Sequence, residues 1–223
     1  MTDGSWIENG DTICFSGDTL VDGQHRLHAV IRSGTSIKSL VVYGLGADAF
    51  ETKDIGKRRS HADALSARGE KNTTRLSAAL VLIGNYMSGN SELSIQYANS
   101  EMLDLPDQFQ GVRDSITLLQ KRSPLLIPSI MDACFYLFSQ KDTNMALQFV
   151  EKVITGSNLT DGCPWLALRE RLLKNSLSKS KLPKEHVFAL CIKAWSAARF
   201  NKPVECLRWR DEGERSESFP VFL

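Results

Sequence analysis

The sequence LVDGQHRLHAV (residues 20–30) changes its pattern in the middle and decides how the front of the chain folds. Its first two residues are typical of the end of a strand, whereas Leu27 and Val30 keep the spacing of a helix. The turn between them, Asp22–Arg26, reads DGQHR, and each of its residues can contact a ligand. The stretch therefore predicts a strand, a short polar turn and a helix.

The residues around this stretch predict a small α/β unit. Thr12–Ser16 and Thr19–Val21 read as short strands separated by Gly17-Asp18, which is a hairpin signal. After the helix, Ser39–Tyr43 reads as a buried strand. A strand, helix, strand order favours a helix laid on a sheet, and we expect this unit to span residues 1–55.

The rest of the chain, residues 56–223, predicts a mostly α-helical region, so the fold class is α+β. Ser60 with Asp63 forms a capping pair ahead of a short helix. A stripe at helical spacing consists of Leu76, Ala79, Leu80, Ile83 and Met87. Further helices are predicted over residues 107–120, 128–139, 143–154, 164–177 and 183–200, three of them beginning at a proline. Leu207 and Trp209 alternate like a short strand.

Composition excludes several classes of protein. The chain has 223 residues, and its 27 Lys and Arg balance 26 Asp and Glu, so its overall charge does not indicate nucleic acid. No apolar run approaches the ~20 residues that span a bilayer, and the residues after Met1 do not read as a signal peptide, so we expect none. The cysteines are odd in number and form no C-x-x-C pair, which argues against disulfides and predicts a cytoplasmic protein. They are Cys14, Cys134, Cys163, Cys191 and Cys206.

The turn Asp22–Arg26 has the chemistry of an anion site. A helix N-terminus presents unpaired N–H groups and a partial positive charge. Gly23 permits a close backbone approach, Arg26 offers a planar fork, and Gln24 and His25 add neutral donors. The alternative is structural: Asp22 caps the helix and Arg26 forms a surface ion pair.

The same residues resemble a known family. The segment DGQHRLHA (residues 22–29) resembles the DGQHR-type box of the ParB/sulfiredoxin superfamily, in which ParB has Gly-Glu-Arg-Arg and sulfiredoxin has Gly-Cys-His-Arg. The likeness to phage and bacterial ParB-like proteins extends over residues 4–30, 44–65 and 193–210. It implies a ParB/sulfiredoxin-like unit that binds nucleotide phosphates, with ATP or CTP and magnesium as the expected ligands.

Two departures from the family limit what the resemblance carries over. Gln24 stands where sulfiredoxin has its reactive cysteine, so thiol repair through this residue is excluded. Relatives also have several tens of residues before the G-x-W that here is Gly4–Trp6. The unit is therefore expected either to be shortened at its N-terminus, with an edge of the pocket missing, or to begin with a sequence that has diverged from the family.

A second candidate is KDIGKRRSHADAL (residues 53–65). The resemblance aligns its D-x-G-x-x-R pattern with Asp54 and Arg59 and implies that both close the nucleotide pocket, where Asp54 would bind a metal ion or orient Arg26. Lys57 and Arg58 complete a basic run that would contact a DNA backbone. The alternative is that the run is a solvated surface.

Other chemistries have weaker support. A zinc site would need His25 and His28, which are three positions apart, together with His61, and we expect no metal site here. The sequence has neither a nucleophile elbow nor a Walker-type loop.

The sequence thus predicts a nucleotide-binding protein of phage or bacterial origin, with phosphoryl transfer or nucleotide hydrolysis as the activity to test, in a DNA-related process. The alternative is a non-enzymatic factor that binds DNA or protein, such as a phage inhibitor of a host enzyme or defence system. Whether the chain is an enzyme, and whether it forms a dimer, stay open.

Overall fold

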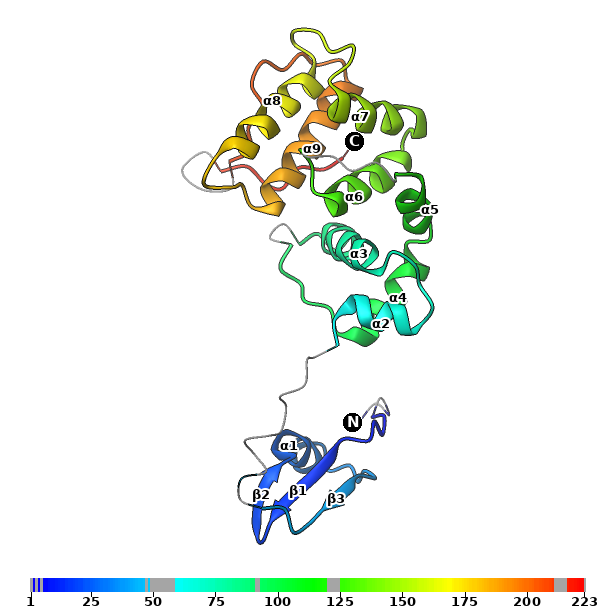
Figure 1. The fold of residues 1–223 in the computed structure, drawn as a ribbon, viewed down its shortest axis with the longest axis vertical. Helices are drawn as coiled ribbons and strands as arrows, with labels where there is room; N and C mark the ends of the chain where they lie inside the picture. Colours follow the sequence, from blue (N-terminus) through cyan, green and yellow to red (C-terminus); the bar gives the residue numbers. More distant parts are fainter. Residues whose placement is uncertain are drawn as a thin grey trace. The chain divides into compact units, whose positions relative to one another are not determined.

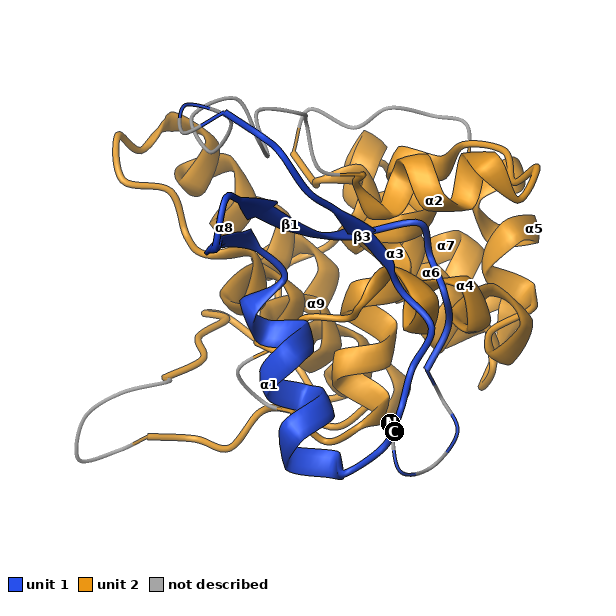
Figure 2. Ribbon diagram, turned by 90° about the horizontal axis from the view of Figure 1, so that it is seen from below, with its two compact units in different colours: residues 1–58 blue, residues 59–223 orange. Residues whose placement is uncertain are grey.

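The computed structural model has an α+β fold in which one small sheet is followed by helices (Figure 1). It describes residues 2, 4, 6–46, 48, 59–90, 93–119, 125–210 and 216–222. The chain divides into two compact units, unit 1 (residues 1–58) and unit 2 (residues 59–223), coloured separately in Figure 2. The boundary predicted between residues 55 and 56 lies outside the described residues.

Unit 1 holds a three-stranded sheet and one helix. Strands β1 (Thr12–Ser16) and β2 (Thr19–Asp22) form an antiparallel hairpin around Gly17-Asp18, as the sequence predicts. Helix α1 (Gln24–Ser33) leads to β3 (Leu40–Val42), which pairs in parallel with β1. The strand order is therefore β2-β1-β3, and the hairpin has an irregularity between Cys14 and Phe15.

Few of the described residues of unit 1 are buried. Of its described residues, the buried apolar ones are Ile13 and Cys14 in the central strand, and α1 has no buried residue. The prediction that Ser39–Tyr43 is a buried strand is wrong: Leu40 and Val41 are 54% and 45% exposed. Among the described strands β3 pairs only with β1, at the edge of the sheet, so an apolar run here does not imply cover on both faces.

Eight described helices make up unit 2 (Figure 1). They are α2 (His61–Ala67), α3 (Thr73–Met87), α4 (Asn99–Gln108), α5 (Gly111–Leu118), α6 (Pro128–Ser139), α7 (Thr143–Thr155), α8 (Pro164–Leu177) and α9 (Lys184–Arg199). Four of the five predicted ranges agree with α6 to α9 within a residue or so at each end. The single helix predicted over residues 107–120 is wrong, because α4 ends at Gln108 and α5 begins at Gly111.

Local signals set several helix ends. Ser60 and Asp63 form the predicted capping box: the Asp63 N–H donates to Ser60 Oγ at 3.2 Å, and the Ser60 N–H donates to Asp63 Oδ2 at 2.9 Å. Asp142 caps α7 by accepting from the Met145 N–H at 2.9 Å. Gly156 ends that helix with a φ of 76°, which favours glycine.

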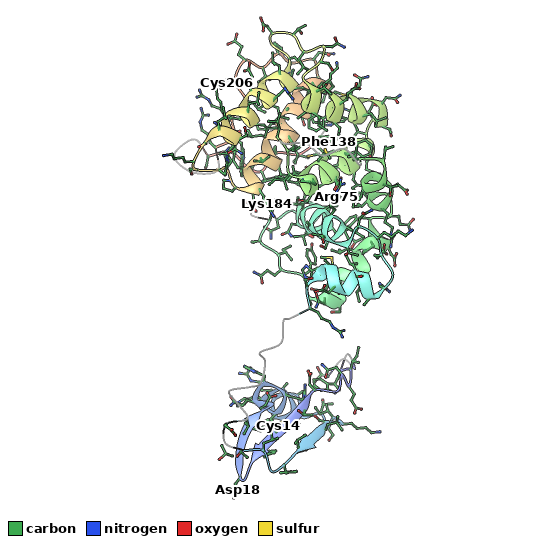
Figure 3. All side chains as sticks on the ribbon, viewed as in Figure 1. Cys14, Asp18, Arg75, Phe138, Lys184 and Cys206 are labelled. Atoms are coloured by element: carbon green, nitrogen blue, oxygen red, sulfur yellow. The ribbon has the colours of Figure 1, made fainter. Side chains whose placement is uncertain are left out.

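The core of unit 2 is centred on α6, most of whose residues are buried. Phe138, labelled in Figure 3, stacks on Trp195 with ring centroids 4.3 Å apart and meets Phe149 edge-on at 5.1 Å. The predicted stripe on α3 contributes to this core, except that Met87, the last residue of the helix, is 57% exposed.

A charged pair joins α3 to α6 inside this core. Arg75, also labelled in Figure 3, donates from Nε to Asp132 Oδ2 at 3.0 Å and from Nη2 to Asp132 Oδ1 at 2.5 Å. Asp132 is fully buried, and this burial raises the pKa of its carboxyl, while Arg75 opposes the rise. Breaking such a pair costs several kcal/mol, about 3–5, because one charge is left buried alone.

The segment after α9 packs on the core without forming a strand. Leu207 and Trp209 are both buried, with the exposed Arg208 between them, so the alternation predicted from the sequence is real. The predicted strand is absent: the structure assigns no strand to Leu207 and Trp209. Trp209 instead donates from Nε1 to the Ser218 carbonyl at 3.3 Å. Within the described residues, no helix is both long and apolar enough to cross a membrane.

Candidate functional site

The turn between β2 and α1 depends on Gly23. Its φ of 98° is left-handed, a conformation that glycine adopts without steric cost. A Cβ on Gly23 would lie 3.0 Å from Ile13 Cγ1 and 3.1 Å from Ile13 Cα. Two constraints, conformation and close packing against strand β1, therefore require glycine at this position.

The N-terminus of α1 lacks a side-chain cap. Asp22 Oδ1 accepts the N–H of Gly23 at 2.7 Å, and no side chain caps the helix. The reading in which Asp22 caps α1 is thus not what the structure shows. The first intrahelical bond runs from the Leu27 N–H to the Gly23 carbonyl at 3.0 Å. The first turn itself carries no acidic residue, and the Asp22 carboxylate lies directly before it.

Arg26 is paired within unit 1. Its Nη1 donates to the Asp11 carbonyl at 2.7 Å, and its Nη2 donates to Asp11 Oδ2 at 3.0 Å. The guanidinium also lies over the ring of Trp6, 5.5 Å from its centroid. The Arg26 side chain is 14% exposed and that of Asp11 is 64% exposed. The ion pair that the alternative reading predicts therefore exists, with its cation shielded and its anion in solvent.

These residues surround one cavity of about 510 Å³ in unit 1. It is lined by Gly10, Asp11, Thr12, Asp22, Gly23, Gln24, His25 and Arg26. The structure thus brings together all five residues of the DGQHR box. Sequence reasoning missed the opposite wall, Gly10–Thr12, although Asn9-Gly10-Asp11 has the composition of a turn before a strand. Asn9 holds this wall by donating from Nδ2 to Asp11 Oδ2 at 2.8 Å.

The second candidate is placed only in part. Asp54, Lys57 and Arg58 lie outside the described residues, so their predicted roles stay predictions. Arg59 is exposed and belongs to unit 2, where its carbonyl accepts from Asn99 Nδ2 at 3.1 Å. Its predicted role in the nucleotide pocket also stays a prediction.

The histidines and cysteines are the side chains of this protein that could bind a metal ion or react as thiols. His61 Nε2 lies 2.8 Å from the Tyr97 carbonyl, which gives this side chain a structural partner inside unit 2. The part of the chain that the structure describes holds no group of three His, Cys, Asp or Glu residues arranged for a metal ion. All five cysteines are free thiols; Cys134 and Cys191 are buried in the core of unit 2, and Cys206 is exposed.

Comparison with known proteins does not assign the chain to a family. No protein-family model matches the chain, and no curated protein or solved structure is significantly similar to it.

Proposed function

We propose that the cavity at the β2–α1 turn binds the phosphates of a nucleotide, and that unit 1 is a ParB/sulfiredoxin-like nucleotide-binding unit. The observation that carries this proposal is convergence: the five box residues line one cavity at the uncapped N-terminus of α1. Gly23 brings the backbone close to a ligand, and the N–H groups of the first turn offer donors to phosphate oxygens. Arg26 supplies the cation.

Asp11 gives the proposed site a competitor for Arg26. Its carboxylate accepts from Arg26 Nη2, a position that a phosphate oxygen would take. A bound phosphate therefore displaces this carboxylate or shares the guanidinium with it. Because Asp11 is mostly exposed, displacement moves it into water and leaves no buried charge behind.

The residues present fit a magnesium nucleotide. Mg²⁺ in proteins is held by one or two carboxylates together with phosphate oxygens and water. Asp11 and Asp22 both line the cavity, and Asp11, once a phosphate displaces it from Arg26, would be a carboxylate ligand for the metal. The metal would supply charge neutralisation, while Arg26 and the first turn of α1 orient the phosphates. Phosphoryl transfer or hydrolysis is the activity to assay, with ATP and CTP as substrates.

The first test compares two arginines of one helix. Arg26→Ala should weaken the binding of ATP or CTP at least about tenfold, because it removes a charge-assisted contact of ~1.5–3 kcal/mol. Arg32→Ala is the matched control: Arg32 is an exposed residue in the last turn of α1 and should not matter. Isothermal titration with and without magnesium measures both. Equal affinity of wild type and Arg26→Ala would show that the phosphate assignment is wrong.

A protein-binding role has one observation in its favour. Leu40, Val41 and Tyr43 expose apolar surface at the edge strand of unit 1. Exposed apolar groups beside an unpaired strand edge are typical of surfaces that bind another chain. Replacing Val41 with lysine should abolish such binding and leave nucleotide affinity unchanged, which separates the two functions.

A further inference from the structure

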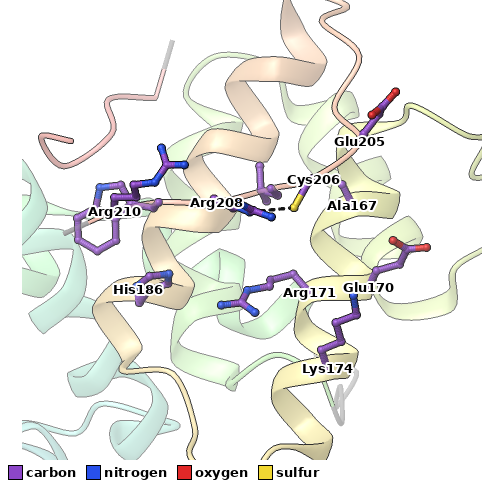
Figure 4. A pocket seen from close by; sticks show the side chains of 11 residues that line it. Ala167, Glu170, Arg171, Lys174, His186, Glu205, Cys206, Arg208 and Arg210 are labelled. Carbon is purple, nitrogen blue, oxygen red and sulfur yellow. Dashed lines mark hydrogen bonds between the residues drawn. The ribbon is translucent and has the colours of Figure 1, made fainter. Parts of the chain in front are cut away.

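Unit 2 contains a second cavity, of about 330 Å³, that no motif in the sequence identifies. It lies between α8, the beginning of α9 and the segment 205–210 (Figure 4). Four of its lining residues are cationic: Arg171, Lys174, Arg208 and Arg210. Two are acidic, Glu170 and Glu205, and Figure 4 shows the Glu205 carboxylate pointing away from the group formed by Arg171 and Arg208.

Within the described part of the chain, the cations of this cavity have few ion-pair partners. Among the described residues, Arg171 and Lys174 have neither an ion pair nor a side-chain hydrogen bond. Arg208 donates from Nε to the thiol of Cys206 at 3.2 Å, and this partner is neutral in its protonated form. Arg210 approaches a carboxylate oxygen of Glu217 only at 3.8 Å. Cations gathered in one concavity repel one another, and a bound anion relieves that repulsion.

The walls of the cavity favour a small ligand with an organic part. Ala167, Leu207 and Trp209 give it an apolar side, and all three are buried against the unit. His186 lies edge-on to Trp209, with ring centroids 5.2 Å apart. Volumes of this size are typical of pockets that enclose small molecules. Leu207 and Trp209 are buried and hold the backbone of this segment in place. The side chains of Cys206, Arg208 and Arg210 therefore project from a fixed stretch of backbone.

We infer that this cavity binds a small phosphate monoester. Arg171 from α8 and Arg208 from the C-terminal segment both line the cavity (Figure 4) and supply the guanidinium groups that hold the phosphate oxygens. Lys174 adds charge at the rim, and the apolar side formed with Trp209 contacts the ester group. The site belongs to unit 2 and does not depend on the nucleotide site proposed for unit 1.

The exposed thiol of Cys206 reports on the occupancy of this cavity. A ligand that covers it should slow the alkylation of Cys206 by iodoacetamide in the full chain, because Cys206 lines the cavity and is exposed when the site is empty. Phenyl phosphate and inorganic phosphate are the two probes. We expect both probes to protect Cys206, and phenyl phosphate to do so at a lower concentration. If inorganic phosphate protects Cys206 at the same concentration as phenyl phosphate, the role of the apolar wall is contradicted.

Variants identify the residues that hold the phosphate. Arg171→Gln and Arg208→Gln should each raise the phenyl phosphate concentration needed for protection at least tenfold. Arg199→Gln is the matched control, because it is an exposed arginine at the other end of α9, ~20 Å along the helix from His186. Arg26→Ala should also leave the protection unchanged, which separates this proposal from the nucleotide site. Unaltered protection in both cavity variants overturns the inference, as does stronger protection by an oligonucleotide than by phenyl phosphate.

Discussion

At the scale of single residues, Arg26 and Asp11 decide how the box of unit 1 works. Of the two structural roles that the sequence predicts for this turn, one is wrong and one is confirmed: Asp22 does not cap α1, but Arg26 does form an ion pair. The partner, Asp11, is fifteen positions earlier in the chain, and no local pattern links the two. The residue types in a turn can be read from the sequence. The contact between Arg26 and Asp11 cannot, because it forms only when the β1–β2 hairpin brings them together.

This pairing predicts that Asp11 restrains anion binding. Asp11→Asn removes the competing charge, while the Asp11 carbonyl can still accept from Arg26. Inorganic triphosphate without magnesium should then bind about threefold to tenfold more tightly, as expected for a partly exposed ion pair of ~1 kcal/mol. The control Asp18→Asn makes the same charge change at the exposed hairpin turn and should have no effect. Weaker binding by Asp11→Asn without metal would contradict the competition.

At the scale of elements, prediction succeeded where a residue acts locally. Pro128 and Pro164 open α6 and α8, and Ser60 caps α2, because proline and serine favour helix starts through their own geometry. Helix α4 was missed because Pro106 lies inside it and normally argues against a helix. The burial of Met102 and Leu105 outweighs that preference, and burial depends on the whole fold.

The ion pair between Glu70, in the segment after α2, and Arg113 on α5 gives a prediction on pH. Arg113 donates from Nη2 to Glu70 Oε1 at 2.6 Å, and these hydrogen bonds lower the pKa of Glu70 below its ordinary value of 4.5. The folded protein then holds this proton less tightly than the unfolded chain, so the contribution is complete above pH 4.5 and is lost as the pH falls through the folded pKa.

Glu70→Gln should therefore reduce the free energy of unfolding by about 1 kcal/mol near neutral pH. The difference from wild type should shrink in acid, as the wild-type carboxyl becomes protonated and loses its charge. Denaturant unfolding of wild type and variant, at neutral pH and in acid below the folded pKa of Glu70, measures this difference in the free energy of unfolding. Glu151→Gln, at an exposed position on α7, is the control. If wild type and Glu70→Gln differ in the free energy of unfolding by the same amount in acid as at neutral pH, the charge of Glu70 is not what stabilises the contact.

At the scale of the whole molecule, the two units differ in how much they bury. The hydrophobic core cluster consists of unit 2 residues from Leu65 to Trp209, whereas the described part of unit 1 buries Ile13 and Cys14. A domain of ~60 residues is marginally stable even with an ordinary core. The thin burial of unit 1 should therefore make it open far more often than unit 2.

Hydrogen exchange tests this difference and its link to function. Amides of α1 and β1 should exchange much faster than those of α6, because opening unit 1 exposes little apolar surface. A ligand that binds only the folded form stabilises it by mass action, so magnesium ATP or CTP should slow exchange in α1 and leave α6 unchanged. Slow exchange in α1 without ligand would mean that unit 1 draws stability from contacts beyond its two buried apolar residues. Slowing confined to unit 1 would place the nucleotide at the turn that Gly23 and Arg26 build.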